Sequence, residues 1–245
     1  MLGREELRWL PWAPLLLAEG LYARIATARL PPAAEVQGAT GRGPRVRLAG
    51  LGDSIIAGIG VETHREGLVG QAAAACAGRA ALRVEWNAVG RSGATSRDVL
   101  EQLLPRVLEF GPQLVVLSVG VNDAVSGTTP AQFKDNLRAI LDALAAARRD
   151  RPAVVFGGIP PLDCFPALPW PLSRLLGDRA RALQDAAVEL TGYRGLRVVV
   201  FPKRLDRAGF CRDGFHPGPD GCRVWAGWVA DGFTSALEEL SGRPA

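Results

Sequence analysis

The sequence predicts an α/β fold built on a mainly parallel sheet. Five apolar runs of strand length alternate along the chain with longer amphipathic stretches. The runs are rich in valine and leucine and nearly continuous, which is typical of strands buried on both faces. Strands that alternate with helices indicate βαβ units with right-handed crossovers. The predicted strands cover residues 45–52, 82–90, 114–120, 153–160 and 196–202.

Five amphipathic segments are predicted to be helices. One of them has Thr95 or Ser96 as its N-cap, and the next begins at Thr129-Pro130, which is a favourable helix start. The segment 157–172 contains too many prolines for a helix or a strand, so it is predicted to form a long loop. The predicted helices cover residues 63–78, 95–111, 129–149, 173–192 and 218–240.

Length and composition predict one large, soluble globular domain. The chain has 245 residues, of which 48% are hydrophobic and 22% charged. The net charge is +4, but no compact run of basic residues indicates a nucleic-acid partner. With two histidines and no C-x-x-C pair, the sequence offers no zinc-ligand set.

The four cysteines are expected to be free thiols, because a chain of this size does not need disulfide staples. One alternative stays open: Cys211 and Cys222 flank a segment with candidate catalytic residues, so a disulfide between these two is conceivable. The remaining cysteines are Cys76 and Cys164.

The chain is predicted to consist of an N-terminal segment, residues 1–44, and one domain, residues 45–245. The N-terminal segment ends in a stretch rich in proline and glycine, residues 30–44, that is typical of a linker. Its apolar run, residues 13–18, is too short for a transmembrane helix and lacks the other parts of a signal peptide. We therefore expect a cytoplasmic protein.

Residues 14–30 are predicted to form an amphipathic helix. The favoured interpretation is a helix that packs on the domain. The alternative is a helix that makes weak contact with a membrane surface, with Trp9 and Trp12 as interfacial anchors. The apolar residues on one face of this helix are Leu17, Leu21 and Ile25.

Four short polar segments follow predicted strands or precede the last helix. Because the carboxyl ends of parallel strands meet at one edge of a sheet, these segments are predicted to converge there, where open α/β sheets bind ligands. The convergence is the strongest argument from the residues themselves. The segments cover residues 52–54, 87–96, 119–124 and 213–218.

A serine nucleophile and its base are predicted within these segments. Ser54 needs a neighbouring base, because a serine hydroxyl is a weak nucleophile at neutral pH. His216 is the candidate base, and Asp213, three residues before it, can accept its Nδ1 proton and orient the ring toward Ser54. His64, the other histidine, is interpreted as structural or surface-exposed.

Acyl transfer also requires hydrogen-bond donors for the oxyanion that develops on the substrate. The sequence offers three candidates at the predicted sheet edge: the amide N–H of Ser54, the amide N–H of Gly93 and the side-chain amide of Asn122. Each of these residue types also occurs commonly in turns without any catalytic role. Their joint occurrence favours a catalytic site.

These segments resemble the conserved blocks of the SGNH hydrolase family, also called the GDSL family. The matching motifs are GDS at 52–54, a glycine block at 87–96, GVND at 120–123 and DGFHP at 213–217. The resemblance runs from about residue 45 to 240, and the first motif reads GDSI where the family name has GDSL.

The resemblance implies the residue roles and the fold. The matching catalytic residues would be Ser54, Asp213 and His216, and the oxyanion hole would consist of Ser54, Gly93 and Asn122. Gly93 is preferred over Gly90 because its position within the second block matches the family pattern. The implied fold is a flavodoxin-like α/β/α sandwich with five parallel strands in the order 2-1-3-4-5.

The predicted function is hydrolysis of small or lipid-type carboxylic esters, without a metal or organic cofactor. Apolar residues in the 157–172 loop, namely Phe165, Leu168 and Trp170, are tentative substrate-binding residues, although they could equally cover the core. The alternatives are a carbohydrate O-acetyl esterase, a nucleotide- or flavin-binding protein and a catalytically silent interaction module. The nucleotide alternative lacks a phosphate-binding glycine motif, and the silent module would have lost a catalytic residue. The oligomeric state is left open.

Overall fold

The sheet at the centre of the molecule has six strands in the order β1-β3-β2-β4-β5-β6. This computed structural model describes residues 8–26, 30–147, 150–202 and 206–242. The predicted order of the five parallel strands is confirmed, and a sixth strand joins them. The strands are β1 (Gln37–Thr40), β2 (Arg45–Gly52), β3 (Arg83–Gly90), β4 (Leu114–Ser118), β5 (Ala153–Phe156) and β6 (Arg197–Val198).

Strand β1 is the main difference from the sequence-based prediction. It lies within the segment predicted to be a linker and pairs antiparallel with β3, with Gly38 opposite Trp86. A side chain at Gly38 would clash with the indole ring, since a Cβ there would lie 2.3 Å from it. The sequence Gln-Gly-Ala-Thr has no alternation of large apolar residues, so its strand character comes from this pairing and not from local propensity.

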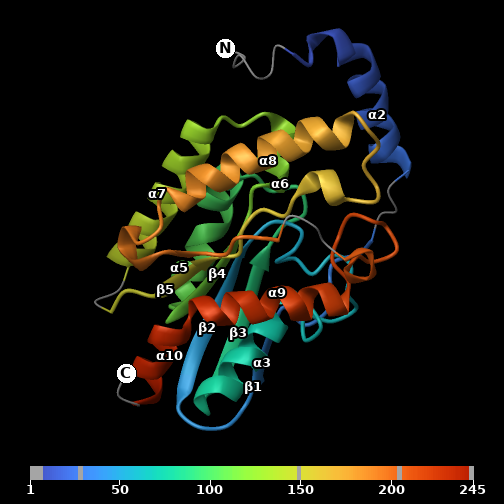
Figure 1. The fold of residues 1–245 in the computed structure, drawn as a ribbon. Coiled ribbons are helices and arrows are strands. Elements are labelled where there is room, and N and C mark those ends of the chain that lie inside the picture. The colour runs from blue at the N-terminus through green and yellow to red at the C-terminus, as the bar shows by residue number, and fades with distance from the viewer. Residues whose placement is uncertain (1–7, 27–29, 148–149, 203–205, 243–245) are drawn as a thin grey trace.

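Helices cover both faces of the sheet (Figure 1). Helices α3, α9 and α10 pack on one face, and α5, α7 and α8 pack on the other. The helical elements are η1 (Leu10–Trp12), α2 (Ala13–Ala26), α3 (Leu68–Ala80), α4 (Ser96–Asp98), η2 (Val99–Leu103), α5 (Leu104–Phe110), α6 (Val121–Ser126), α7 (Pro130–Ala146), η3 (Leu162–Cys164), α8 (Leu172–Val188), η4 (Tyr193–Gly195), η5 (Arg207–Gly209), α9 (Pro219–Gly232) and α10 (Thr234–Ser241).

One predicted helix is interrupted by a π-helical turn. Its start is a capping box, in which Thr95 and Asp98 satisfy each other's backbone amides. Pro105 has no amide hydrogen to donate, and the turn just before it widens into η2, in which Leu104 bonds to Val99. The three pieces α4, η2 and α5 therefore form one continuous helical segment.

Several predicted elements are shorter than expected at their ends. Strands β4 and β5 stop at Ser118 and Phe156, since the chain turns toward the site beyond them. The predicted 157–172 loop contains only the short turn η3 before α8 begins. Residues 148–149 of one predicted helix lie outside the described residues.

The N-terminal helix α2 stands at the margin of the molecule, beside the start of α8 (Figure 1). None of its described side chains is buried. Residues 27–29, the predicted continuation of this helix, lie outside the described residues. Within the ranges that the structure describes, no helix combines the length and the apolar character needed to cross a bilayer.

Candidate active site

Ser54 lies directly beyond the carboxyl end of β2. The backbone there is held close to β4, because the amide of Asp53 donates to the carbonyl oxygen of Ser118 at 3.1 Å. Glycine is required at position 52, where a Cβ would lie only 1.8 Å from the same carbonyl oxygen. The close approach of the two strands thus fixes where the serine begins its turn.

Ser54, His216 and Asp213 form one chain of hydrogen bonds. Ser54 Oγ lies 3.0 Å from His216 Nε2, and His216 Nδ1 lies 2.7 Å from Asp213 Oδ2. Serine and histidine are 162 positions apart in sequence, so the fold brings them together. The structure therefore assembles the three residues that the sequence predicted as nucleophile, base and orienting acid.

The loop that carries His216 is rigid for local reasons. The other carboxylate oxygen of Asp213, Oδ1, accepts the backbone amides of Phe215 at 2.8 Å and of His216 at 2.9 Å. The amide of Cys211 donates to the carbonyl oxygen of His216, which closes the loop. One aspartate thus fixes both the backbone and the ring of the histidine.

Asp213 is a permanent carboxylate in this setting. Its side chain is fully shielded from solvent, and burial by itself would raise its pKa. The hydrogen bonds from His216, Cys211 and Phe215 outweigh that effect and hold the pKa of Asp213 well below its usual range. A charged acceptor at Oδ2 stabilises the imidazolium that forms when the histidine takes a proton.

Asn122 and the loop after β3 lie next to each other. The Nδ2 amide group of Asn122, in the first turn of α6, donates to the carbonyl oxygen of Ala94 at 3.0 Å. An asparagine amide carries two hydrogens. One holds the loop, and the second is available for an oxyanion.

The amides of Ser54 and Gly93 are the two backbone candidates. Neither donates a hydrogen bond to any residue within the described ranges. Gly93 has φ +80 and open space where a Cβ would be, whereas a Cβ at Gly90 would lie 2.2 Å from the amide nitrogen of Ala57. Gly90 is therefore a packing residue, and Gly93 faces the open side of the loop.

Two buried carboxyl groups, those of Asp53 and Asp123, lie next to the candidate catalytic residues. Burial raises the pKa of Asp53 to about 7, and the charge of Asp123 adds to this rise. Asp123 is itself buried, which raises its pKa, and it accepts two hydrogen bonds from Ser96, at 2.6 Å and 2.9 Å. Neither acid was predicted to have a role; their position next to Ser54 and Asn122 was the available signal in the sequence.

An apolar cavity of about 460 Å³ opens beside Ser54. Its size is typical of a small-molecule site. Aromatic side chains from four separate segments form much of its wall, and Asp206, Asp220 and Arg223 also line it. The aromatic lining residues are Phe165, Phe201, Phe210, Phe215, Trp225 and Trp228.

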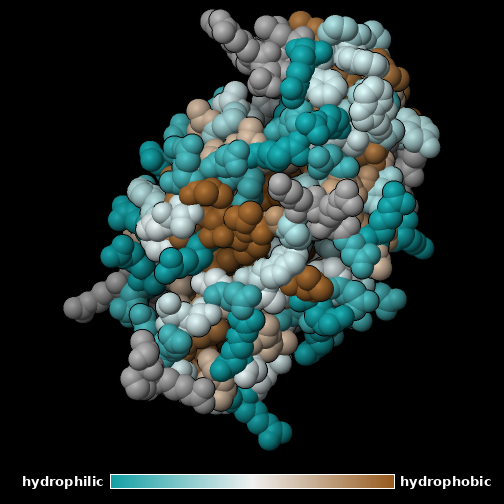
Figure 2. Space-filling model, in the orientation of Figure 1, coloured by the Kyte–Doolittle hydropathy of each residue, from teal (hydrophilic) through white to brown (hydrophobic). Residues whose placement is uncertain are grey.

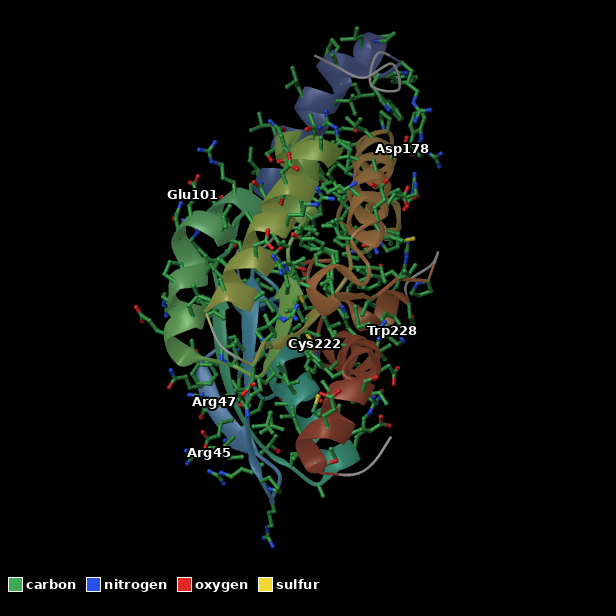
Figure 3. All side chains as sticks on the ribbon, turned by 90° about the vertical axis from the view of Figure 1, so that its left-hand side faces the viewer. Arg45, Arg47, Glu101, Asp178, Cys222 and Trp228 are labelled. Carbon is green, nitrogen blue, oxygen red and sulfur yellow. The ribbon has the colours of Figure 1, made fainter. Side chains whose placement is uncertain are left out.

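A second hollow continues this cavity along the edge of the sheet. It is lined by residues 197–202 and shares Phe201, Pro202 and Trp228 with the first cavity. Figure 2 shows apolar surface gathered between α8 and α9 on this side of the molecule. Trp228 projects from α9 on the same side (Figure 3).

The three tentative substrate-binding residues have different positions. Phe165 lines the cavity with Ser54. Leu168 packs against the hydrophobic core, and Trp170 is 65% exposed and lies against Trp12 with ring centroids 5.2 Å apart. Neither Leu168 nor Trp170 is among the described residues that line the cavity.

Sequence reasoning missed most of the cavity wall. Trp225 and Trp228 stand three residues apart on the helix that follows His216, and this spacing on one helix face was the available signal. Trp225 also donates its indole N–H to the carbonyl oxygen of Gly157 at 2.7 Å. That bond holds α9 against the end of β5.

His64 and the cysteines lie outside the hydrogen-bonded chain, with one exception. His64 is buried, which lowers its pKa, and it packs beside Trp86. None of the four cysteines forms a disulfide, so the bridge between Cys211 and Cys222 that the sequence left open is absent. The exception is Cys211, whose Sγ lies 3.0 Å from Asp213 Oδ1.

Comparison with known proteins identifies the class. Residues 51–224 match the GDSL-like Lipase/Acylhydrolase family, a span that contains Ser54, Asn122 and His216. The chain belongs to this family and is therefore an ester hydrolase of the SGNH or GDSL type. No curated protein matches the sequence.

Solved structures with the same fold include a lipase/acylhydrolase from Enterococcus faecalis, at 23% identity and a TM-score of 0.59, over 80% of this chain and 96% of that one. TesA is 25% identical with a TM-score of 0.57, over 79% of this chain and 99% of the other. A family 3 carbohydrate esterase from Clostridium thermocellum is 16% identical with a TM-score of 0.60, over 81% of this chain and 100% of that one. The fold is thus shared by lipolytic and carbohydrate-directed enzymes.

Proposed function

We propose that this protein is a serine esterase that hydrolyses carboxylic esters of small or lipid-type acyl groups. The observation that carries the proposal is the chain from Ser54 Oγ through His216 to Asp213, at 3.0 Å and 2.7 Å, beside an apolar cavity. A catalytically silent module would have no reason to keep a buried, charged Asp213 aligned on a histidine.

The proposed reaction has two steps. His216 Nε2 takes the proton of Ser54 as Oγ attacks the ester carbonyl carbon, and the resulting oxyanion is held by the amides of Ser54 and Gly93 and by Asn122. The imidazolium then gives its proton to the departing alcohol oxygen, which leaves an acyl-serine. Water, deprotonated by His216, attacks this acyl group, and the acid leaves as Ser54 regains its proton.

The lining of the cavity favours an acyl chain as the bound group, and not a sugar. Its wall is largely aromatic and aliphatic, and its charged residues, Asp206, Asp220 and Arg223, contribute little of the lining. A glycan site would require several hydrogen-bonding side chains to match hydroxyl groups. Deacetylation of a carbohydrate is the alternative that the test below also measures.

The test is hydrolysis of p-nitrophenyl esters from acetate to palmitate, together with an acetylated xylan. The wild-type enzyme should be active on the nitrophenyl series, and Ser54→Ala should abolish turnover while the unfolding temperature stays the same. Activity confined to the acetylated glycan would favour the carbohydrate esterase. Residual wild-type rates in the Ser54→Ala enzyme would refute the assignment of the nucleophile.

A further inference from the structure

Residues 33 and 34 form a strap that is bonded to the chain just beyond the nucleophile. The amide of Ala33 donates to the carbonyl oxygen of Ala57 at 3.2 Å. The amide of Ala34 donates to the carbonyl oxygen of Glu62 at 3.0 Å, and its own carbonyl oxygen accepts the amide of His64 at 3.1 Å. Three backbone hydrogen bonds thus join the strap to a segment that begins at the active site.

The turn that carries Ser54, residues 53–60, is held together by its own backbone. The amide of Ala57 donates to the carbonyl oxygen of Asp53 at 3.0 Å. The amide of Ile59 donates to the carbonyl oxygen of Ser54, also at 3.0 Å. Because Ala57 is bonded to the strap on one side and to the start of the turn on the other, a shift of the strap is transmitted to Ser54.

The side chain of Ala33 packs directly on this turn. Ala33 is only 6% exposed. A Cβ on Gly58 would lie 2.5 Å from the Cβ of Ala33 and 3.1 Å from the ring of His64. The methyl group of Ala33 therefore lies against the backbone of Gly58, and a larger side chain at position 33 would press on the turn.

The end of the turn contacts the loop that carries the base. A Cβ on Gly60 would lie 2.6 Å from the carbonyl oxygen of Pro217 and 3.2 Å from the Cβ of His216. The turn is therefore in contact with both the strap and the His216 loop. The distance of 3.0 Å between Ser54 Oγ and His216 Nε2 depends on where the turn lies relative to that loop.

We propose that the strap positions the nucleophile: Ala33 and Ala34 hold the 53–60 turn so that Ser54 Oγ stays within hydrogen-bond reach of His216. Both alanines lie in the segment predicted to be a linker, and they precede residues 51–224, which match the family. Neither is among the described residues that line the cavity, so they are positioning residues. The inference rests on the proposed function, because it takes Ser54 as the nucleophile.

The test compares matched substitutions at the two alanines in the full chain. Ala33→Val and Ala33→Leu add bulk where the side chain is enclosed by the turn. Ala34→Val and Ala34→Leu add the same bulk one position later, at an exposed side chain. Ala33→Gly is the conservative variant, since it adds no bulk. All five substitutions keep the backbone amides that make the hydrogen bonds.

Two rates are measured for each protein. The first is steady-state hydrolysis of p-nitrophenyl butyrate, which gives kcat and KM. The second is the rate of labelling by an alkyl fluorophosphonate, in which Ser54 Oγ bonds to phosphorus, fluoride leaves and His216 takes the hydroxyl proton. Labelling reports on the nucleophile without an ester substrate. Both rates are measured well below the unfolding temperature of every variant, so that a smaller folded fraction does not account for a loss.

Ala33→Val should lower kcat by about tenfold, and Ala33→Leu by more, while KM stays within about twofold, because misplaced reacting atoms raise the barrier more than they weaken binding. The labelling rate should fall in parallel. Ala33→Gly and both Ala34 variants should stay within about threefold of the wild type. Ala33→Val is the milder change and decides the comparison if Ala33→Leu does not fold.

Four results would overturn the proposal. They are wild-type kcat in a folded Ala33→Leu enzyme, equal losses at positions 33 and 34, a raised KM at unchanged kcat, and failure of both larger Ala33 variants to fold, which would assign Ala33 to the core alone. A wild-type protein that is labelled but hydrolyses no ester would refute the proposed function alone, and the labelling rates would then decide the inference. A wild-type protein that does neither would refute both.

Discussion

The thiol of Cys211 donates to Asp213 Oδ1, on the carboxylate oxygen that does not face His216. Burial, with a smaller contribution from Asp213, raises the pKa of this thiol to about 11, so it remains protonated and keeps its hydrogen. Cys211 is thus a positioning residue for the aspartate.

Cys211→Ala should remove one of the three donors to Asp213 Oδ1 and so hold the carboxylate less firmly. We expect kcat to fall by about threefold to tenfold with little change in KM, which corresponds to about 1 kcal/mol. Cys211→Ser should restore most of the rate, because a hydroxyl also donates. Steady-state kinetics of the three proteins decide this; equal losses in the alanine and serine variants would argue for packing instead.

Asp213→Asn should test the charge behind the histidine. The amide keeps the size of the side chain but cannot stabilise an imidazolium, so kcat should fall by about 10³ to 10⁴. Asp142→Asn serves as the control, since Asp142 is a surface acid bonded to Tyr193 and Arg194. An Asp213→Asn enzyme with near-wild-type kcat would exclude the proposed role of Asp213 in stabilising the imidazolium of His216.

Asn122→Ala should remove the side-chain oxyanion donor, together with its hydrogen bond to the carbonyl oxygen of Ala94. We expect kcat to fall by about 10² to 10³ at a similar KM, because the donor acts on charge that appears only in the transition state. Asn136→Ala is the matched control: Asn136 donates to Ser96, in the neighbouring network, but lies outside the hydrogen-bonded chain. Comparable losses in both variants would indicate a structural effect on the loop instead.

Trp228→Ala should change the enzyme's preference for the length of the acyl chain in its ester substrate. Removal of this indole enlarges the cavity where it joins the second hollow, so the ratio of kcat/KM for long over short nitrophenyl esters should rise by about tenfold or more. Trp170→Ala should leave the ratio unchanged, because Trp170 lies outside the cavity. A shift in the Trp170 variant alone would reverse this assignment.

Asp53 should make stability depend on pH. Its pKa is raised to about 7, so between about pH 4 and 7 the folded state keeps a proton that the unfolded chain has lost. Stability therefore falls as pH rises through this window and stays lowered above it, by up to about 4 kcal/mol.

Asp53→Asn keeps an oxygen for the amide of Ile55, 3.1 Å away in the wild type, and removes the titration. Urea unfolding near pH 4 and pH 8 should show the variant gaining on the wild type at the higher pH. An identical pH dependence in both proteins would contradict the buried, titrating carboxyl.

The sequence predicted the hydrogen-bonded chain well for a physical reason. The key positions lie just after a strand end or just before a helix, as Ser54, Asn122 and His216 do. Parallel strands bring such positions to one edge of the sheet, whatever the details of side-chain packing. The aromatic cavity wall could not be predicted in the same way. It depends on how α9 is rotated about its axis, and that rotation follows from the packing of its buried face together with the bond from Trp225 to Gly157.

Trp170 and β1 show two further limits. Trp170 in the 157–172 loop lies against Trp12, more than 150 positions away, so the apolar character of the loop did not reveal which way its tryptophan pointed. Strand β1 has a sequence typical of a turn and exists because β3 offers it a free edge. Both features arise from tertiary pairing, which local pattern does not encode.

Strand β1 also sets where the protein can be shortened. A polypeptide that began at Arg45 would leave the backbone of β3 open along residues 84–87 and would uncover the indole of Trp86, which is now 2% exposed. An open, apolar edge of this kind recruits strands from other molecules. Solubility on storage, together with a red-shifted tryptophan emission, would therefore separate a truncation at residue 45 from one at residue 30, even where both retain every catalytic side chain.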